Sequence, residues 1–296
     1  MKLTYPFTFD ATEDFSDYRR DQQGVPQVYF PHLRRWEYNP ITLTQYGLYH
    51  LAQYEQTGEE SSRSLACTMA AWLLANQREW HRQIGAWVYD FDLPFYGPAA
   101  PWISGMAQGQ AISLLLRMAT LEKRTEYEMA CHRALRAFHF SVAEGGVCQR
   151  LDNGAVIFEE YPTQPPSMVL NGHLFALIGI HDYATYFDDH RAAELFDNCT
   201  DQLKTILPRY DTGYWNLYDL HPSHRLASPN YIRIHVQLMK FFATLCGDNV
   251  FLHFAKKWQH YLDDTFCRAR YFIGKVLEKA RLHLRWETQL FGRVFL

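Results

Sequence analysis

The sequence predicts a mainly α fold, an (α/α) toroid or barrel of about four helical hairpins with β-hairpin loops on one rim. Three observations predict it. Small and polar residues recur about every 63 positions, each time where a long apolar helix would begin. A second helix-like segment follows each of these starts, and a longer connection leads to the next one. A constant period of this length indicates stacked supersecondary units.

The first 39 residues precede the repeat. We expect residues 1–39 to be an irregular lead-in packed on the barrel, with turns at Gly24–Val25–Pro26 and Tyr38–Asn39–Pro40, and residues 40–296 to form one α/α-barrel catalytic domain. The N-terminus has no apolar core of signal-peptide length, and no apolar run reaches the length of about 18 residues that a membrane span needs. A cytoplasmic protein without a membrane span is therefore expected.

The first helix of each hairpin is richer in Gly, Ala and Leu, which suits an inner ring, and the second is more amphipathic, which suits the outside. Gly105 and Gly109 are expected to let neighbouring helices approach closely. The starting motifs of the first helices are Thr44–Gln45–Tyr46–Gly47–Leu48, Ala107–Gln108–Gly109–Gln110, Leu170–Asn171–Gly172–His173 and Arg233–Ile234–His235–Val236. The second helices are expected over Ser61–Arg78, Thr125–Ser141, Arg191–Leu207 and Asn249–Ala269.

Three long connections carry strand and turn signals. Apolar and polar residues alternate over Trp87–Asp92, and the segment Gly145–Glu160 is broken at Asn153–Gly154, a pair typical of hairpin turns. The third connection is Pro208–Pro229. Long loops on a helical scaffold are where binding residues usually lie, so the functional site is expected on these connections.

The string Glu159–Glu160–Tyr161–Pro162–Thr163 ends the second connection. Two carboxylates and a phenol stand just before a proline that favours an extended backbone. This arrangement places acid and base side chains on a short loop beside a helix start near Ser167, as a site that moves protons requires.

Composition narrows the functional classes. The net charge is −3 with no long basic run, so nucleic-acid binding has little electrostatic support. Aromatic residues make up 16% of the chain, which suits a wet, ring-binding groove as well as a core. None of the cysteines forms a CxxC pair, and their spread matches no zinc spacing, so reduced structural thiols are expected rather than a disulfide framework. They are Cys67, Cys131, Cys148, Cys199, Cys246 and Cys267.

An ordered set of strings spans about residues 24–260. It comprises Asn39-Pro40 leading into Gln45-Tyr46-Gly47-Leu48, Pro101-Trp102-Ile103-Ser104-Gly105-Met106-Ala107-Gln108-Gly109-Gln110-Ala111-Ile112-Ser113, Glu159-Glu160-Tyr161-Pro162-Thr163, Leu170-Asn171-Gly172, Leu207-Pro208-Arg209-Tyr210-Asp211-Thr212-Gly213, Tyr218-Asp219-Leu220, and Tyr231 with His235. As a set, these strings resemble the D-glucuronyl C5-epimerase family in a compact microbial form.

The resemblance implies an α/α barrel that inverts C5 of D-glucuronate residues to L-iduronate in heparosan- or heparan-sulfate-type chains. It implies catalytic roles for Glu160 and Tyr231, with Tyr161 beside Glu160 in contact with the substrate. It also implies substrate contact for Tyr218 and a groove position for Tyr38. The animal enzymes carry Arg three residues after the Tyr of Tyr-Asp-Leu, where this chain has His221. The residue that binds the substrate carboxylate therefore stays open.

C5 epimerisation removes a proton next to a carboxylate and returns one to the opposite face, so two acid/base groups are expected. Unperturbed pKa values are about 4.3 for Glu and about 10 for Tyr, so burial should raise that of Glu160 or a cation should lower that of Tyr231. The enediolate formed on the way needs cations or hydrogen-bond donors. His221, His224, Arg225 and Arg233 cluster in the sequence, and Arg225 or His221 is favoured for this role.

The expected substrate-binding residues are Tyr218, Tyr38, His221, Arg225, Arg233, His235 and Gln108. His235 shares a helix face with Tyr231 if both are helical, but it could equally be a buried structural histidine. The segment Gln108–Gly109–Gln110 could serve helix packing alone, and Glu159 with Glu160 could be a solvated loop pair.

Other activities stay open. A uronate lyase begins with the same proton removal and then eliminates the linked sugar. An inverting glycoside hydrolase would need a second acid, for which Asp90, Asp92 and Asp211 are available. A glycan-binding module without activity is the third alternative. The expected partner is a uronic-acid polysaccharide. A homodimer stays open. No cofactor and no metal site are expected from the residues, although the resemblance allows a structural divalent cation.

Overall fold

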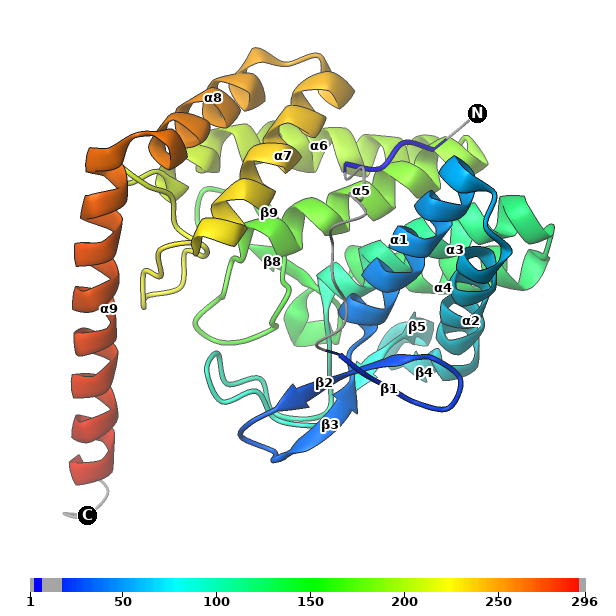
Figure 1. Cartoon of the computed structure of the whole chain (residues 1–296), viewed down its shortest axis with the longest axis horizontal. Coiled ribbons are helices and arrows are strands. Elements are labelled where there is room, and N and C mark those ends of the chain that lie inside the picture. The colour runs from blue at the N-terminus through cyan, green and yellow to red at the C-terminus, as the bar shows by residue number, and fades with distance from the viewer. Residues whose placement is uncertain (1–2, 7–17, 293–296) are drawn as a thin grey trace. The chain divides into compact units, whose positions relative to one another are not determined.

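The structure, a computed structural model, describes residues 3–6 and 18–292, with side chains as far as residue 280 (Figure 1). The described residues are mainly helical. Their α-helices are α1 (Pro40–Thr57), α2 (Glu60–Asn76), α3 (Gly105–Glu122), α4 (Thr125–Leu135), α5 (Leu170–Phe187), α6 (His190–Ile206), α7 (Pro229–Cys246), α8 (Asn249–Asp263) and α9 (Thr265–Gly292). Short 3-10 helices lie at η1 (His81–Gln83), η2 (Arg136–His139), η3 (Val142–Glu144) and η4 (Leu207–Tyr210).

The predicted hairpins are confirmed. Helices α1 and α2 pack together, as do α3 and α4, and α7 and α8 (Figure 1). In the remaining hairpin, the rings of His181 on α5 and Phe196 on α6 lie 5.0 Å apart. The first helix of every hairpin has 18 residues, so the repeat seen in the sequence is a repeat of structure.

The strands are short and lie in the connections and the lead-in. They are β1 (Arg19–Arg20), β2 (Pro26–Phe30), β3 (Arg35–Tyr38), β4 (Arg78–Trp80), β5 (Ile84–Ala86), β6 (Val88–Tyr89), β7 (Trp102–Ile103), β8 (Cys148–Arg150) and β9 (Val156–Phe158). Strands β1, β2 and β3 form an antiparallel sheet, and the others pair as β4-β5, β6-β7 and β8-β9. The predicted turn at Asn153–Gly154 joins β8 to β9, with Gly154 in the left-handed region at φ 84°.

Two differences from the sequence-based expectation concern local structure. The lead-in holds a three-stranded sheet, with the predicted turn near Gly24, but at Tyr38–Asn39–Pro40 β3 ends and Asn39 caps the start of α1 instead of forming a turn. The helix predicted over Asn249–Ala269 is two helices, because Asp264 adopts an extended conformation and its side chain accepts a hydrogen bond from the Cys267 amide. Asp264 therefore ends α8 and caps the start of α9.

The chain separates into two compact units, Met1–Met168 with Gly172–Leu203, and Val169–Asn171 with Lys204–Leu296. In the first unit, α3 is buried along most of its length and meets α5 at close range. A Cβ atom at Gly109 would lie 2.6 Å from the Cα atom of Ala176, so the predicted packing role of Gly109 is confirmed. Arg117 on α3 also forms a buried ion pair with Asp182 on α5, at 2.6 Å.

In the second unit, the connection before α7 is tied to the helices that follow it. The carboxylate of Asp211 accepts hydrogen bonds from the Trp258 indole and the Tyr261 hydroxyl, both at 3.1 Å. The rings of Trp215 and Tyr271 stack at 4.5 Å, and Glu278 accepts a hydrogen bond from the amide of Leu226. Helices α8 and α9 thus hold the loop that carries Tyr218 and Arg225.

All six cysteines are free thiols, as predicted. Among the helices that the structure describes, none combines the length and the apolar character needed to cross a membrane.

Candidate active site

The loop that carries the two glutamates is anchored at its first residue. The amide of Glu159 donates to the carbonyl of Val147, and its own carbonyl accepts from the amide of Gly105, both at 2.8 Å. A Cβ atom at Gly105 would lie 2.8 Å from that carbonyl oxygen, so only glycine allows this approach. The loop therefore leaves β9 in a direction set by β8 and by the first residue of α3.

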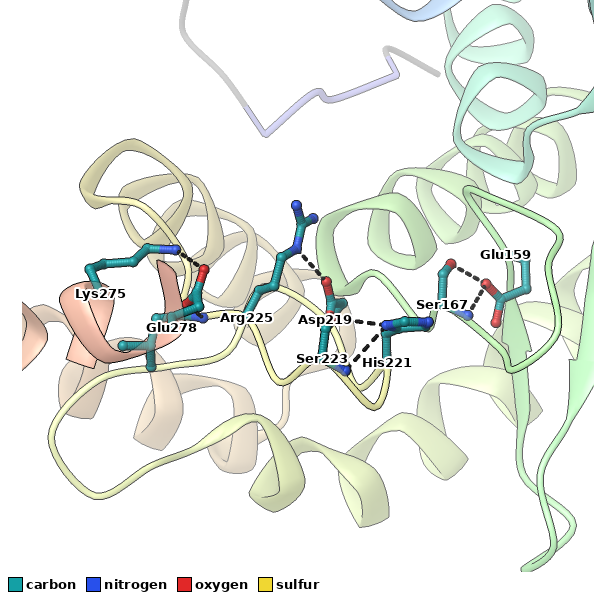
Figure 2. Close-up of polar contacts among 9 residues, drawn as sticks. Glu159, Ser167, Asp219, His221, Ser223, Arg225, Lys275 and Glu278 are labelled. Atoms are coloured by element: carbon teal, nitrogen blue, oxygen red, sulfur yellow. Dashed lines mark hydrogen bonds and ion pairs between the residues drawn. The ribbon is translucent and has the colours of Figure 1, made fainter. Parts of the chain in front are cut away.

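The side chain of Glu159 is fully buried and holds the far end of the same loop. Its carboxylate accepts hydrogen bonds from the hydroxyl and the amide of Ser167 (Figure 2). It also accepts one from the amide of Met168. Burial raises the pKa of Glu159 to about 7, although the bonds from Ser167 and Met168 act in the opposite direction. The alternative of a solvated glutamate pair is wrong, because both carboxylates are buried.

Glu160 is 4% exposed and lies against the first turn of α5. A Cβ atom at Gly172 would be 2.6 Å from Cβ and 2.7 Å from Oε2 of Glu160, so the small residue makes room for this carboxylate. Amide groups at a helix start favour a negative charge. The carboxylate of Glu160 is therefore buried beside the start of α5.

Tyr161 extends an aromatic cluster beside Glu160. Its ring stacks on Tyr96 at 4.6 Å and lies 5.9 Å from Trp102, which stacks on Tyr89 at 4.1 Å. Burial raises the pKa of Tyr89, and the charge of Glu160 adds to the effect. Glu160 therefore lies close enough to this cluster to act on it electrostatically.

The second unit brings together three other predicted residues. The rings of Tyr218 and Tyr231 meet edge to face at 4.6 Å, and the guanidinium carbon of Arg225 lies 4.8 Å from the centre of the Tyr218 ring. Tyr231 is in the first turn of α7, where its amide donates to Oγ of the capping residue Ser228, and it is 38% exposed.

Arg225 and His221 are each held by a neighbour (Figure 2). Nε of Arg225 donates to Oδ2 of Asp219 at 3.0 Å, and the Asp219 side chain is fully buried. Nδ1 of His221 lies 2.9 Å from the hydroxyl of Ser223. The guanidinium over Tyr218 is thus fixed by a buried anion.

His235 and Arg233 are on α7 but do not share the surroundings of Tyr231. His235 is fully buried, with Nδ1 2.6 Å from the amide nitrogen of Asn216, and burial lowers its pKa to about 3. The imidazole is therefore neutral and cannot be the cation that lowers the pKa of Tyr231. Arg233 is exposed and donates to the side chain of Asn230 at 3.1 Å.

Gln108 and Tyr38 have partners that define local structure. Gln108 is fully buried, and its amide accepts from the Trp87 backbone and donates to the carbonyls of Gly85 and Ala134. This is the packing alternative of the sequence analysis, so Gln108 leaves the set of proposed substrate contacts. Tyr38 donates from its hydroxyl to Asp21 at 2.8 Å, and its ring remains partly exposed.

Sequence reasoning missed the residues that support the site. Ser167 and Asp219 bind the side chains of Glu159 and Arg225, but neither was assigned a role, because a spacing of six or eight residues in a loop does not reveal a contact. Gly172 did carry a signal, since it recurs at the start of an apolar helix, but its closeness to Glu160 depends on the path of the loop.

Each carboxylate that could serve as the second acid of a glycoside hydrolase forms an ion pair or hydrogen bonds within the protein. These residues are Asp90, Asp92 and Asp211. Asp90 pairs with Arg78 at 2.7 Å, and Asp92 accepts from the amide of Ala100 at 2.8 Å. Asp211 binds Trp258 and Tyr261, as described above. Within the described part of the chain, no group of three or more His, Cys, Asp and Glu side chains is placed to hold a metal ion.

Chemically, the first unit presents a buried carboxylate beside a tyrosine ring, and the second presents a partly exposed tyrosine beside a fixed guanidinium. These are groups that can take up and return protons and bind an anion.

Comparison with known proteins identifies the family. The family model for the D-glucuronyl C5-epimerase C-terminus matches residues 81–260. A D-glucuronyl C5-epimerase of Caenorhabditis elegans is 35% identical over 177 residues, which cover 54% of this chain and 29% of that protein. An uncharacterised protein of Methanocaldococcus jannaschii is 28% identical over 176 residues, covering 58% of this chain and 56% of that one. The matches thus span less than two thirds of either relative.

A solved structure shares the fold. The unsaturated glucuronyl hydrolase of Bacillus sp. GL1, described as responsible for the degradation of glycosaminoglycan, superposes with a TM-score of 0.51 at 18% identity, over 76% of this chain and 62% of the hydrolase. The fold class is therefore mainly α of the α/α-barrel type, as the sequence predicted. Because the family model covers more than half of the residues, the chain belongs to the D-glucuronyl C5-epimerase C-terminus family.

Proposed function

We propose that the chain is an isomerase that inverts C5 of D-glucuronate residues to give L-iduronate within a heparosan- or heparan-sulfate-type polysaccharide. The observation that supports this most directly is that the family match over residues 81–260 includes Glu160, Tyr161, Tyr218 and Tyr231. Glu160 is the buried carboxylate that such a reaction needs.

The proposed reaction has two proton transfers and no redox step. One of Glu160 and Tyr231 removes the proton from C5, and the electron pair of the C–H bond passes into the adjacent carboxylate to form an enediolate. The other group delivers a proton to the opposite face of C5, which inverts the centre. A general acid/base pair of this kind contributes typically two to four orders of magnitude in rate.

The enediolate carries more negative charge than the substrate, so a fixed cation near it lowers the barrier. Arg225 is proposed for this role, with His221 as a second donor. Its bond to the buried Asp219 holds the guanidinium in one orientation, so little reorganisation is needed during the reaction. Tyr161 and Tyr218 are proposed to contact the sugar ring.

The experiment is solvent deuterium exchange. The protein is incubated with heparosan in heavy water, and deuterium at C5 and iduronate content are read by NMR. The proposed function requires both to appear without chain cleavage. An unsaturated product with new ultraviolet absorbance would instead identify a lyase, and new reducing ends would identify a hydrolase.

Two variants test the assigned residues. Glu160→Gln and Tyr231→Phe each keep the shape of the side chain but remove the transferable proton, so each should lower the exchange rate at least a hundredfold. Glu79→Gln and Tyr29→Phe, at exposed positions, are matched controls and should exchange at the parent rate. Exchange at the parent rate in Glu160→Gln or Tyr231→Phe would refute the role of that residue.

A further inference from the structure

A groove of about 420 Å³ lies in the first unit, and neither Glu159 nor Glu160 lines it. It is lined by residues from β3, the last turns of α2, the start of β4 and the segment 87–91. Its volume is within the range of small-molecule sites, about 300–1,000 Å³. The resemblance implies a groove position for Tyr38, but neither the proposed mechanism nor the family match assigns a ligand to the other residues that line this groove.

Aromatic rings form one wall of the groove. Trp72 and Tyr38 lie with ring centres 5.3 Å apart, and both are partly exposed. Trp87 also lines the groove and is almost fully buried, and its indole nitrogen donates to the carbonyl of Leu73 at 2.8 Å. A partly exposed indole on a rigid floor is the surface on which the C–H face of a pyranose ring can stack.

Paired charges line the groove as well. Arg78 donates to Asp90 at 2.7 Å and to the carbonyl of Val88 at 3.2 Å, while Arg35 pairs with Glu37. Each guanidinium already faces a carboxylate, so the four charges cancel and an isolated anion gains little. The side chains of Arg78 and Asp90 are 49% and 64% exposed, so their remaining donors and acceptors can reach neighbouring hydroxyl groups.

The segment 87–91 connects the groove to the site. Trp87, Val88, Asp90 and Phe91 line the groove, whereas Tyr89 does not. Tyr89 instead stacks on Trp102, and the charge of Glu160 adds to the burial that raises the pKa of Tyr89. Successive side chains of an extended segment point to opposite sides, so Val88 and Asp90, which flank Tyr89, face the groove while Tyr89 faces Trp102.

We propose that this groove is a secondary sugar-binding site that holds a pyranose unit of the polysaccharide other than the reacting uronate, with Trp72 as its stacking surface and the Arg78–Asp90 pair binding its hydroxyl groups. The inference rests on the proposed function for the class of ligand. The paired charges favour a neutral unit, such as an N-acetylhexosamine, over the uronate itself.

The test measures binding without turnover. Heparosan oligosaccharides are titrated by calorimetry into the full chain carrying Glu160→Gln. The titration is repeated with a double variant that carries Trp72→Ala as well, and the two affinities are compared. Loss of one aromatic contact should weaken binding about tenfold, and Trp72→Phe should restore most of it. Arg78→Ala should weaken binding severalfold, and because its ion pair is exposed it should leave the fold intact.

Tyr29→Ala is the matched control, since Tyr29 is an exposed aromatic residue of the neighbouring strand β2 and does not line the groove. It should bind as tightly as the parent. The proposal is overturned if Trp72→Ala and Arg78→Ala both bind like the parent, if Tyr29→Ala weakens binding equally, or if Glu160→Gln binds no heparosan.

Deuterium exchange separates this inference from the proposed function. If the wild-type chain exchanges no deuterium but binds heparosan in a Trp72-dependent way, the epimerase proposal is wrong and the proposed sugar site in the groove is supported. If exchange proceeds with the same KM in Trp72→Ala as in the wild type, the proposed sugar site is wrong and the epimerase proposal is supported.

Discussion

Glu159 and Glu160 are neighbours in sequence with different surroundings. The carboxylate of Glu159 accepts hydrogen bonds from the hydroxyl and amide of Ser167 and the amide of Met168, which lie at the end of the same loop. Glu160 instead points to the first turn of α5, in the space that Gly172 leaves. The first residue therefore shapes the loop on which the second is presented, and this division of roles predicts different consequences of mutation.

The raised pKa of Glu159 predicts a dependence of stability on pH. The folded chain binds the proton more tightly than the unfolded chain, so the stability that this group contributes is full below pH 4.5 and is lost as pH rises through about 7. The loss is of the order of 3 kcal/mol. Glu159→Gln can keep the hydrogen bonds through one oxygen without the charge, so its free energy of unfolding should lack this decline.

Urea unfolding of Glu159→Gln and the parent at pH 5 and pH 8 measures the effect. Glu79→Gln, at an exposed position, should keep the decline of the parent. An equal decline in Glu159→Gln would show that another group causes it.

The ion pair of Arg225 and Asp219 predicts a stability cost that is separate from catalysis. Arg225→Ala removes the cation beside a fully buried carboxylate and should lower the free energy of unfolding by about 3–5 kcal/mol. Adding Asp219→Asn removes the buried charge, so the double variant should recover part of that loss. Chemical denaturation of the single and double variants measures both.

Arg233→Ala serves as the control for Arg225, because this exposed arginine donates to the Pro229 carbonyl and the Asn230 side chain in its own helix turn and faces no buried carboxylate there. It should change stability by no more than about 0.5 kcal/mol. A double variant no more stable than Arg225→Ala would argue against the pair as the cause.

At the scale of elements, the hairpins follow from the sequence because each depends on local signals. Asn39 and Ser104 cap α1 and α3, and Gly58 ends α1 in the left-handed conformation. The apolar first helices are buried against their neighbours. The break between α8 and α9 was missed because Asp264 is a single residue within a continuous helical pattern, and its cap is visible only in three dimensions.

The contact of α3 with α5 predicts the effect of a single methyl group. In Gly109→Ala the new Cβ would lie 2.6 Å from the Cα atom of Ala176 and from the carbonyl oxygen of Phe175. Alanine favours a helix by about 1 kcal/mol, but backbone atoms must move to admit it. Overpacking should prevail, with a loss of about 1–3 kcal/mol by thermal or chemical unfolding.

Ala71→Ser is the control, because it adds one heavy atom at an exposed position of α2. It should leave stability within about 0.5 kcal/mol of the parent. A Gly109→Ala variant as stable as the parent would mean that α3 and α5 can separate at no cost.

At the scale of the whole chain, six free thiols predict that stability does not depend on redox conditions. Adding a reductant should leave the thermal midpoint unchanged. Burial raises the pKa of Cys148 to about 12 and that of Cys199 to about 11, so these thiols should react slowly with a thiol reagent in the folded chain. All six should react after denaturation. A midpoint that falls in reductant would reveal a disulfide.

The proposed site illustrates why prediction from sequence stops at candidates. Glu160, Tyr161, Tyr218 and Tyr231 stand out through ordered motifs, and their types suit proton transfer. Gln108 and His235 stand in equally suggestive strings, yet both are fully buried with hydrogen-bond partners. Accessibility is set by neighbours distant in sequence, so it cannot be derived from spacing.

The helical hairpins, the β8–β9 turn, the free thiols and the family could be predicted from the sequence, because period, caps, turn residues and motifs are local properties. The support that Glu159 gives to its own loop, the contact of Asp219 with Arg225 and the groove beside Val88 and Asp90 became visible only in the folded chain. Each of these depends on side chains brought together by packing, and burial then sets their charge and their hydrogen bonds.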